Sequence, residues 1–287
     1  MNKKIIRIIS WGGLGDILLS TPSYAALKQK HTNAKIIMYC STKRHKEVYK
    51  HNPHIDELRG GKYYMGPFTY LMYRLKRWHF YFCNYASLAP SINYNKNATE
   101  IIAEMFGVEL KNKKIQIFLT EQEEDKARKE LAKYRNPVIL HITPLSSKNK
   151  SWTLEKWSQL VRSLPEYSFL QLGEQKEDKV EGAVDLRGAT TFRESMAFIK
   201  FAKSFVGVDS SLSHVTNAFD IPGVVLFGAS NPGVWGHVNN INLYKALPCA
   251  PCIDLLLSSP CPYGNPCMNS ISVEDVREAL LRQIGHR

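Results

Sequence analysis

Short, nearly continuous apolar runs recur along the chain, and amphipathic or polar stretches separate them. These runs predict strands at residues 4–9, 35–40, 138–142, 168–172, 204–208 and 223–228. Apolar runs of this length, without strict alternation, are typical of parallel strands that are covered on both faces. Because helical patterns fall between the strands, the sequence predicts an α/β fold with doubly wound, parallel sheets.

Capping residues indicate where several helices begin. Thr21 and Pro22 predict an N-cap and a first helical position for the residues that follow them. Thr153 predicts the start of a helix with one apolar face. Ser272, with Asp275 three residues later, forms a capping-box pattern that predicts the final helix.

A charged stretch at residues 120–137 divides the chain, and it predicts an exposed helix that ends at a proline. We therefore expect two Rossmann-like domains, over residues 1–125 and 126–287. Two such sheets leave a central cleft between them, and the carboxyl ends of their strands face it.

Length and composition favour a folded protein with a large core. The chain has 287 residues, of which 44% are hydrophobic. Its apolar runs are all shorter than the roughly 20 residues needed to cross a bilayer. The apolar residues near the N-terminus are interrupted by Arg7 and lack a small-residue cleavage site. These observations predict a cytoplasmic protein.

The net charge of +12 is unevenly distributed along the chain. Residues 1–120 contain 19 Lys and Arg against 7 Asp and Glu, whereas residues 121–287 contain 19 of each kind. This excess indicates an anionic partner for the first half, such as phosphate groups, nucleic acid or an acidic membrane surface, and a merely solvated basic surface is the alternative. Residues 70–82 mix aromatic and basic side chains, which fits either a lipid headgroup boundary or a core helix whose cations reach solvent.

A polar turn follows the strand predicted at residues 204–208. Asp209 ends that strand, and Ser210, Ser211, Leu212, Ser213 and His214 lead into a helix. Backbone N–H groups and the helix dipole at such a position suit a phosphate or a carboxylate, and serine hydroxyls add donors. The alternative is structural, with Ser210 as an ordinary helix cap and His214 as a buried core residue.

Three glycines and an aspartate follow the first predicted strand. Gly12, Gly13, Gly15 and Asp16 lie where a phosphate-binding loop would be placed. A dinucleotide site needs G-x-G-x-x-G and an acidic residue at the end of the second strand, but that strand ends at Cys40. The chain also has no G-x-x-x-x-G-K-[ST] loop. These absences argue against a dinucleotide oxidoreductase, a kinase and a polymerase.

Four short motifs occur together, in the order and with the spacing of one enzyme family. They are Gly15-Asp16, Lys150-Ser151-Trp152, the turn from Asp209 to His214, and residues 225–228. Together they resemble the heptosyltransferases of glycosyltransferase family 9, and the resemblance covers almost the whole chain.

The resemblance implies a GT-B fold, with the acceptor on the first domain and an ADP-heptose donor on the second. Asp16 matches the family's proposed general base, which takes the proton of the acceptor hydroxyl as that oxygen attacks and inverts the anomeric carbon. Lys150 matches the lysine that binds the donor phosphates and stabilises the leaving group. The further substrate-binding candidates are Gly15, Thr143, Ser147, Glu174 for the ribose hydroxyls, Asp209, Ser210, Ser211, Leu212 and His214. Since the chain has no D-x-D pair, we expect no Mg²⁺ site.

Four of the six cysteines lie in one stretch rich in Pro and Gly. Cys249, Cys252, Cys261 and Cys267 have the spacing C-x2-C-x8-C-x5-C. In a cytoplasmic protein such a set favours a structural metal ion over disulfides or free thiols, and four protein ligands leave no open position for catalysis. Zinc and iron both accept four thiolates. The cluster also resembles the iron-binding four-cysteine finger of bacterial autotransporter heptosyltransferases.

The resemblance implies transfer of heptose to the inner core of lipopolysaccharide or lipooligosaccharide. The basic first half then faces the anionic glycolipid at the inner face of the inner membrane, and no nucleic-acid partner is expected. A protein acceptor of the autotransporter type and a noncatalytic nucleotide-binding module are the alternatives. A homo-oligomer is compatible with each of them.

Overall fold

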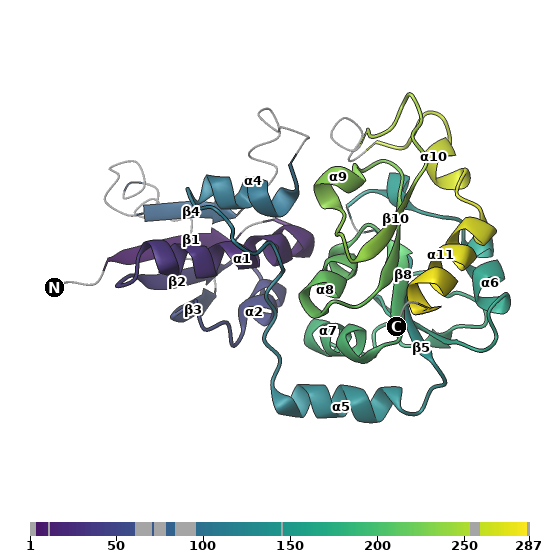
Figure 1. Cartoon of the computed structure of the whole chain (residues 1–287), viewed down its shortest axis with the longest axis horizontal. Coiled ribbons are helices and arrows are strands. Elements are labelled where there is room, and N and C mark those ends of the chain that lie inside the picture. The colour runs from purple at the N-terminus through teal and green to yellow at the C-terminus, as the bar shows by residue number, and fades with distance from the viewer. Residues whose placement is uncertain are drawn as a thin grey trace. The chain divides into compact units, whose positions relative to one another are not determined.

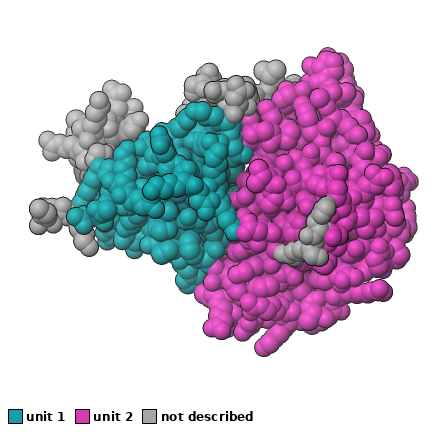
Figure 2. Space-filling model, viewed as in Figure 1, with its two compact units in different colours: residues 1–118 teal, residues 119–287 magenta. Residues whose placement is uncertain are grey.

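The computed structural model describes residues 4–10, 12–60, 71, 79–83, 96–144, 146–252 and 259–285. The chain divides into two compact units, Met1–Phe118 and Leu119–Arg287 (Figure 2). Within the described ranges, none of the helices combines the length and the apolar character that a membrane span needs. Most of the aromatic and basic segment 70–82 lies outside the described residues, so its role at a membrane surface stays a prediction.

The described part of the first unit is built on a four-stranded parallel sheet with the order β3-β2-β1-β4 (Figure 1). The strands are β1 (Ile5–Ser10), β2 (Lys35–Cys40), β3 (Glu57–Gly60) and β4 (His79–Cys83), and the helices are α1 (Leu14–Lys30), α2 (Lys43–Tyr49) and α4 (Ala98–Met105). β1 pairs with β2 on one side and with β4 on the other. The first two predicted strands are confirmed and lie side by side.

Helix α1 begins earlier than the sequence predicted. It starts at Leu14 and passes through Pro22, so Thr21 is an interior residue and the predicted N-cap there is wrong. Pro22 has no N–H to donate to the carbonyl of Leu18, but the Thr21 hydroxyl donates to that oxygen at 2.7 Å. The same hydroxyl accepts the N–H of Gln116 at 2.9 Å. A side-chain hydrogen bond therefore replaces the missing backbone bond and lets the helix continue.

The second unit, as far as it is described, has a six-stranded parallel sheet with the order β10-β9-β8-β5-β6-β7 (Figure 1). The strands are β5 (Pro137–His141), β6 (Ser168–Gln171), β7 (Val184–Asp185), β8 (Ser204–Val208), β9 (Gly223–Phe227) and β10 (Asn240–Tyr244). The helices are α5 (Glu121–Leu131), the short 3-10 helix η3 (Lys148–Lys150), α6 (Leu154–Arg162), α7 (Phe192–Phe201), α8 (Ser211–Phe219), α9 (Pro232–Trp235), α10 (Pro266–Asn269) and α11 (Val273–Gly285). The predicted parallel α/β class is confirmed.

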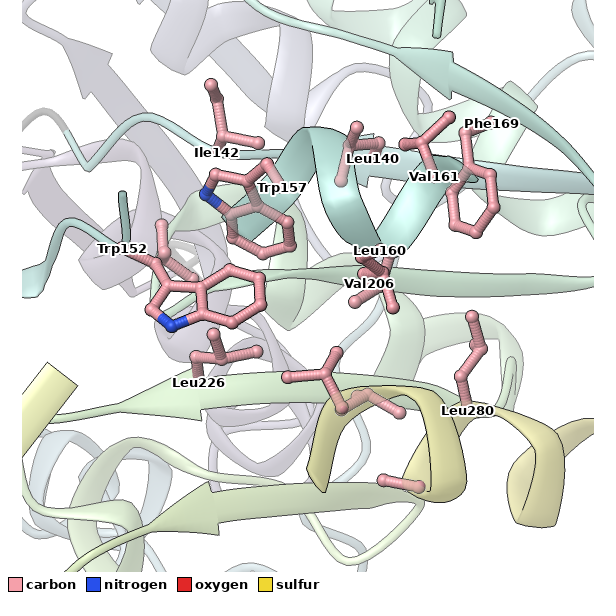
Figure 3. Packing of buried hydrophobic residues seen from close by; sticks show 14 of the residues in the cluster. Leu140, Ile142, Trp152, Trp157, Leu160, Val161, Phe169, Val206, Leu226 and Leu280 are labelled. Atoms are coloured by element: carbon pink, nitrogen blue, oxygen red, sulfur yellow. The ribbon is translucent and has the colours of Figure 1, made fainter. Parts of the chain in front are cut away.

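Helices cover both faces of this second sheet. α6 and α11 pack together on one face, and α8 lies on the other beside α7. On the α6 side, a cluster of buried apolar residues includes Trp152 and Trp157, whose rings meet edge to face with centroids 4.7 Å apart (Figure 3). The predicted caps at Thr153 and Ser272 are confirmed, since Thr153 accepts a first-turn N–H of α6 and Ser272 exchanges hydrogen bonds with Asp275 at the start of α11.

Helix α5 belongs to the second unit. The division falls after Phe118, whereas the sequence placed the domain boundary after residue 125, which lies inside α5. Arg193 of α7 donates to Glu123 at 2.7 Å, and this guanidinium lowers the pKa of Glu123 to about 2. Lys200 forms a second ion pair with Glu124. These ion pairs hold α5 against α7, so the boundary precedes the helix.

Candidate functional site

A buried ion pair lies at the carboxyl edge of the second sheet. Nζ of Lys150 is 2.7 Å from Oδ2 of Asp209. Lys150 ends η3 in the loop after β5, and Asp209 directly follows β8. Since β5 and β8 are neighbouring parallel strands, both loops leave the sheet at the same edge. Lys150 is only 9% exposed and Asp209 only 3%, so the two charges face each other away from bulk water.

The same carboxylate oxygen accepts a second hydrogen bond. The Ser230 hydroxyl, in the loop after β9, donates to Oδ2 of Asp209 at 2.7 Å. Burial by itself would raise the pKa of Asp209, but the charge of Lys150 and the hydrogen bonds donated by Lys150 and Ser230 outweigh it and hold the pKa below its usual value. Asp209 is therefore ionised and orients two side chains from two different loops.

The predicted anion-binding turn forms the start of α8. Ser210 occupies the N-cap position in a capping-box arrangement with Ser213, and its hydroxyl lies 3.0 Å from Nδ1 of His141. The Ser213 hydroxyl closes the turn by accepting the N–H of Ser210 at 3.2 Å. Ser210 is therefore the cap residue of α8, as the structural alternative expects, and it also bonds to His141. The N–H groups of Ser211 and Leu212 have no carbonyl partner inside the helix, which suits this end of α8 to an anion.

Three buried histidines near this turn stay neutral. Nδ1 of His214 lies 2.9 Å from Nε2 of His237. Burial lowers the pKa of His214 to about 4, and burial followed by the charge of His214 lowers the pKa of His237 to about 3. Burial also lowers the pKa of His141 to about 4. At neutral pH, therefore, the positive charge at this part of the site is that of Lys150.

Three further predicted residues lie in the loops after β5 and β6. Ser147 accepts a backbone N–H of η3 at 3.2 Å and so shapes the turn that carries Lys150. Thr143 is half-buried in the same loop. Glu174 follows β6 and forms an ion pair with Lys176 at 3.0 Å. Because β6 pairs with β5 in parallel, Glu174 lies at the same edge of the sheet as the lysine turn.

In the first unit, Asp16 occupies the first turn of α1. Its Oδ2 accepts the N–H of Gly13 at 2.9 Å, and Gly15 is the second residue of the helix. Gly12 has a φ of +127°, and a Cβ at this position would lie 2.8 Å from Oδ2 of Asp16. Only glycine fits such a backbone and such a contact. The glycines therefore make room for a carboxylate.

His45 also supports this turn, although no sequence motif pointed to it. It is buried in α2, and its Nδ1 lies 3.1 Å from the Ser10 hydroxyl and 3.0 Å from the Ser41 hydroxyl. Burial lowers the pKa of His45, while hydrogen bonds with the backbone of Ser10 and Gly12 act to raise it. His45 therefore ties the end of β1 to the glycine turn that holds Asp16.

The four predicted metal ligands are free thiols. Burial raises the pKa of Cys267, and the charges of Cys252 and Cys249 raise it further. Cys252 is affected in the same way by burial and then by Cys261 and Cys249. Within the described residues, no three His, Cys, Asp or Glu side chains are arranged to hold a metal ion. The metal site therefore stays a prediction.

A sequence profile of glycosyltransferase family 9 (heptosyltransferase) matches residues 93–256, which is more than half of the chain. The chain belongs to glycosyltransferase family 9. The matched range of this family 9 protein contains Lys150, Asp209 and Ser230, but it begins after Asp16 and ends before Cys261. The buried ion pair therefore lies inside the family match, whereas Asp16 lies outside it and its role stays a prediction.

The family 9 protein is similar to lipopolysaccharide heptosyltransferase 1 of Pseudomonas aeruginosa, with 32% identity over 128 residues. That match spans 40% of this chain and 36% of the relative's own length. Among solved structures, Escherichia coli ADP-heptose lipopolysaccharide heptosyltransferase II has a TM-score of 0.73 at 15% identity and covers 99% of both chains. The iron-containing dodecameric glycosyltransferase TibC of enterotoxigenic E. coli has a TM-score of 0.75 at 15% identity, over 99% of this chain and 77% of TibC. These structures confirm the predicted GT-B fold.

We predict that the family 9 protein loses stability as the pH falls from about 6.5 towards 4. His141, His214 and His237 have pKa values of about 4, 4 and 3 in the folded state. The unfolded chain binds more protons than the folded protein in this range, so the free energy of unfolding rises with pH. Each of the three histidines contributes up to about 1.4 kcal/mol for each pH unit. Urea unfolding at several pH values measures the slope.

Removal of one buried histidine tests this prediction. His141→Asn should reduce the dependence of the free energy of unfolding on pH. A free energy of unfolding that stays constant between pH 7 and pH 5 would contradict the assignment of three neutral buried histidines.

Proposed function

We propose that this protein is an inverting glycosyltransferase that moves heptose from ADP-heptose to the inner core of lipopolysaccharide or lipooligosaccharide. The observation that carries the proposal is the buried Lys150–Asp209 pair beside the N-terminus of α8, inside the range that matches the family. The similarity to a lipopolysaccharide heptosyltransferase supports the acceptor class. The solved complex of TibC with ADP-D-β-D-heptose supports the donor.

In this proposal the donor diphosphate binds between Lys150 and the first turn of α8. The lysine ammonium has three protons, and one of them is directed to Asp209, so the others are available to phosphate oxygens. The N–H groups at the start of α8 and the helix dipole add attraction for the same anion. As the bond between the anomeric carbon and the diphosphate breaks, the lysine stabilises the charge that develops on ADP.

Asp16 acts as the general base in this mechanism. The N–H of Gly13 fixes the orientation of its carboxylate. Asp16 accepts the proton of the acceptor hydroxyl, the hydroxyl oxygen forms the new bond to the anomeric carbon, and ADP leaves from the opposite face with inversion. Glu174 binds the ribose hydroxyls, and Thr143 and Ser147 add contacts to the phosphates.

The acceptor in this proposal is an anionic glycolipid at the inner face of the inner membrane. The charge excess of residues 1–120 supports it, because a basic surface attracts a phosphorylated lipid. The four-cysteine cluster favours one alternative, a protein acceptor of the autotransporter type. Labelled donor offered with lipid and protein acceptors side by side separates the two, and absence of turnover with both would support a noncatalytic nucleotide-binding module.

We also propose that Cys249, Cys252, Cys261 and Cys267 hold one structural ion of iron or zinc. Their thiols are free and several of them influence one another's pKa, and four thiolates are a ligand set that both ions accept. The ion would cross-link the loop that follows β10. Four protein ligands leave it no open coordination position, so we assign it no part in the transfer reaction.

We predict that Lys150→Gln removes ADP binding and lowers the transfer rate by at least about 100-fold. Glutamine keeps a donor for Asp209 but has no charge for the diphosphate. The measurement is thermal stabilisation by ADP, GDP, UDP and CMP, in which the wild type should respond selectively to ADP. Lys148→Met, an exposed lysine of the same turn, is the control and should behave as wild type. Selective stabilisation by UDP or GDP would contradict the donor assignment.

We predict that Asp16→Asn lowers kcat by about 100-fold to 10,000-fold and leaves the donor KM nearly unchanged. The asparagine oxygen still accepts the N–H of Gly13, so the turn keeps its shape, but the amide cannot take a proton. Initial rates with both substrates saturating give the test. Near-normal transfer by this variant would show that another group is the base.

We predict that the protein purifies with about one iron or zinc ion per chain, and that Cys252→Ser and Cys261→Ser each lose it. Elemental analysis of the purified protein measures the ion. Cys40→Ala is the control, because burial in β2 raises the pKa of Cys40 to about 12 and removes it as a ligand. Wild-type protein with four reactive thiols and neither ion would refute the metal site.

A further inference from the structure

One side chain joins the cysteine segment, here residues 249–252 and 259–267, to the turn that carries the donor lysine. Asn149 directly precedes Lys150 in η3 and is only 3% exposed. Its amide nitrogen donates to the carbonyl of Ser259 at 2.9 Å, and its amide oxygen accepts the N–H of Cys261 at 2.9 Å. Both ends of the amide therefore hold a segment that lies 110 to 112 residues further along the chain.

The same asparagine is also fixed on the side of the lysine. Its N–H donates to the Ser147 hydroxyl at 3.2 Å, and the N–H of Lys150 donates to the Ser147 carbonyl at 3.3 Å. Asn149 and Lys150 are thus consecutive residues of one short closed turn. A shift of the amide moves the backbone of Lys150, whose ammonium has to reach Asp209.

Cys252 contacts the loop that carries Ser230, which is the other hydrogen-bond partner of Asp209. The N–H of Cys252 donates to the carbonyl of Ala229 at 2.8 Å. The next residue, Ser230, donates to Oδ2 of Asp209 at 2.7 Å. The cysteine segment is therefore hydrogen-bonded to the residue before Lys150 and to the residue before Ser230, on both sides of the buried carboxylate.

We propose that Asn149 is a positioning residue that transmits the state of the cysteine segment to the donor site. When the thiols are held together, Asn149 keeps the lysine turn in the conformation that binds the diphosphate, and when the segment loosens, the turn loosens with it. The inference rests on the proposed function, because it takes the Lys150–Asp209 pair as the donor site. Such coupling is reciprocal, so a nucleotide bound at Lys150 in turn orders the cysteine segment.

Two substitutions of Asn149 in the full chain test this coupling. Asn149→Asp keeps an oxygen for the N–H of Cys261 and loses the donor to Ser259, whereas Asn149→Ala loses both contacts. We expect the ADP dissociation constant and the donor KM to rise about 5-fold in the first variant and about 50-fold in the second, with the acceptor KM unchanged. The matched control is Asn240→Ala, which removes a buried amide bonded to Thr216 and should leave ADP binding unchanged.

Hydrogen–deuterium exchange adds a readout that needs no enzymatic activity. Bound ADP should slow exchange in residues 259–267 of the wild type and should have no such effect in Asn149→Ala. The inference is overturned if Asn149→Ala binds ADP with wild-type affinity, or if ADP does not change the exchange rate of residues 259–267 in the wild type. Either result leaves the proposed function standing. A wild type that binds no ADP overturns the proposed function. In that case, faster exchange of residues 259–267 in Asn149→Ala would still support the structural contact between Asn149 and the cysteine segment.

Discussion

The second unit depends on two opposite charges that lie together out of water. A buried lysine or aspartate without its partner is strongly destabilising, so Lys150 and Asp209 are tolerated at the sheet edge only in contact with each other. That contact requires the loops after β5, β8 and β9 to be placed to within hydrogen-bond distance, because Ser230 joins the same carboxylate oxygen. The parallel order of these strands supplies the placement, since it brings all three loops to one edge.

The buried side chains around the Lys150–Asp209 pair are uncharged. The buried histidines are neutral at physiological pH, and the Ser210 hydroxyl bonds to one of them. Among the described residues, the buried charges at this point are those of Lys150 and Asp209. In the proposed function, the lysine protons not used by Asp209 and the N-terminus of α8 attract the donor diphosphate.

Much of the scaffold follows from local sequence, because its determinants lie within a few residues of one another. Apolar runs located the strands, and Thr153 and Ser272 located helix starts whose hydrogen bonds reach only three residues ahead. Thr21 misled the prediction, since its hydroxyl serves a carbonyl freed by Pro22 and an N–H of a distant segment.

The site residues also differ in whether their role can be predicted from local sequence. Asp16, Lys150 and Asp209 were found because they stand in short motifs, and the structure places the last two in direct contact. Asn149, Ser230 and His45 were missed, because each acts on a residue brought near only by the fold. The domain boundary was displaced for the same reason, since the ion pairs that attach α5 to α7 join residues about 70 positions apart.

Main-chain atoms form one side of several contacts that fix the functional residues. The N–H of Gly13 holds Asp16, the carbonyl of Ala229 holds Cys252, and the carbonyl of Ser259 receives the amide of Asn149. Such an atom is present whatever side chain the position carries, so many substitutions there leave the contact intact. An architecture anchored in this manner can accumulate mutations over evolutionary time while its working geometry persists. Such tolerance is consistent with the fold that this chain shares with heptosyltransferase II and TibC at 15% identity.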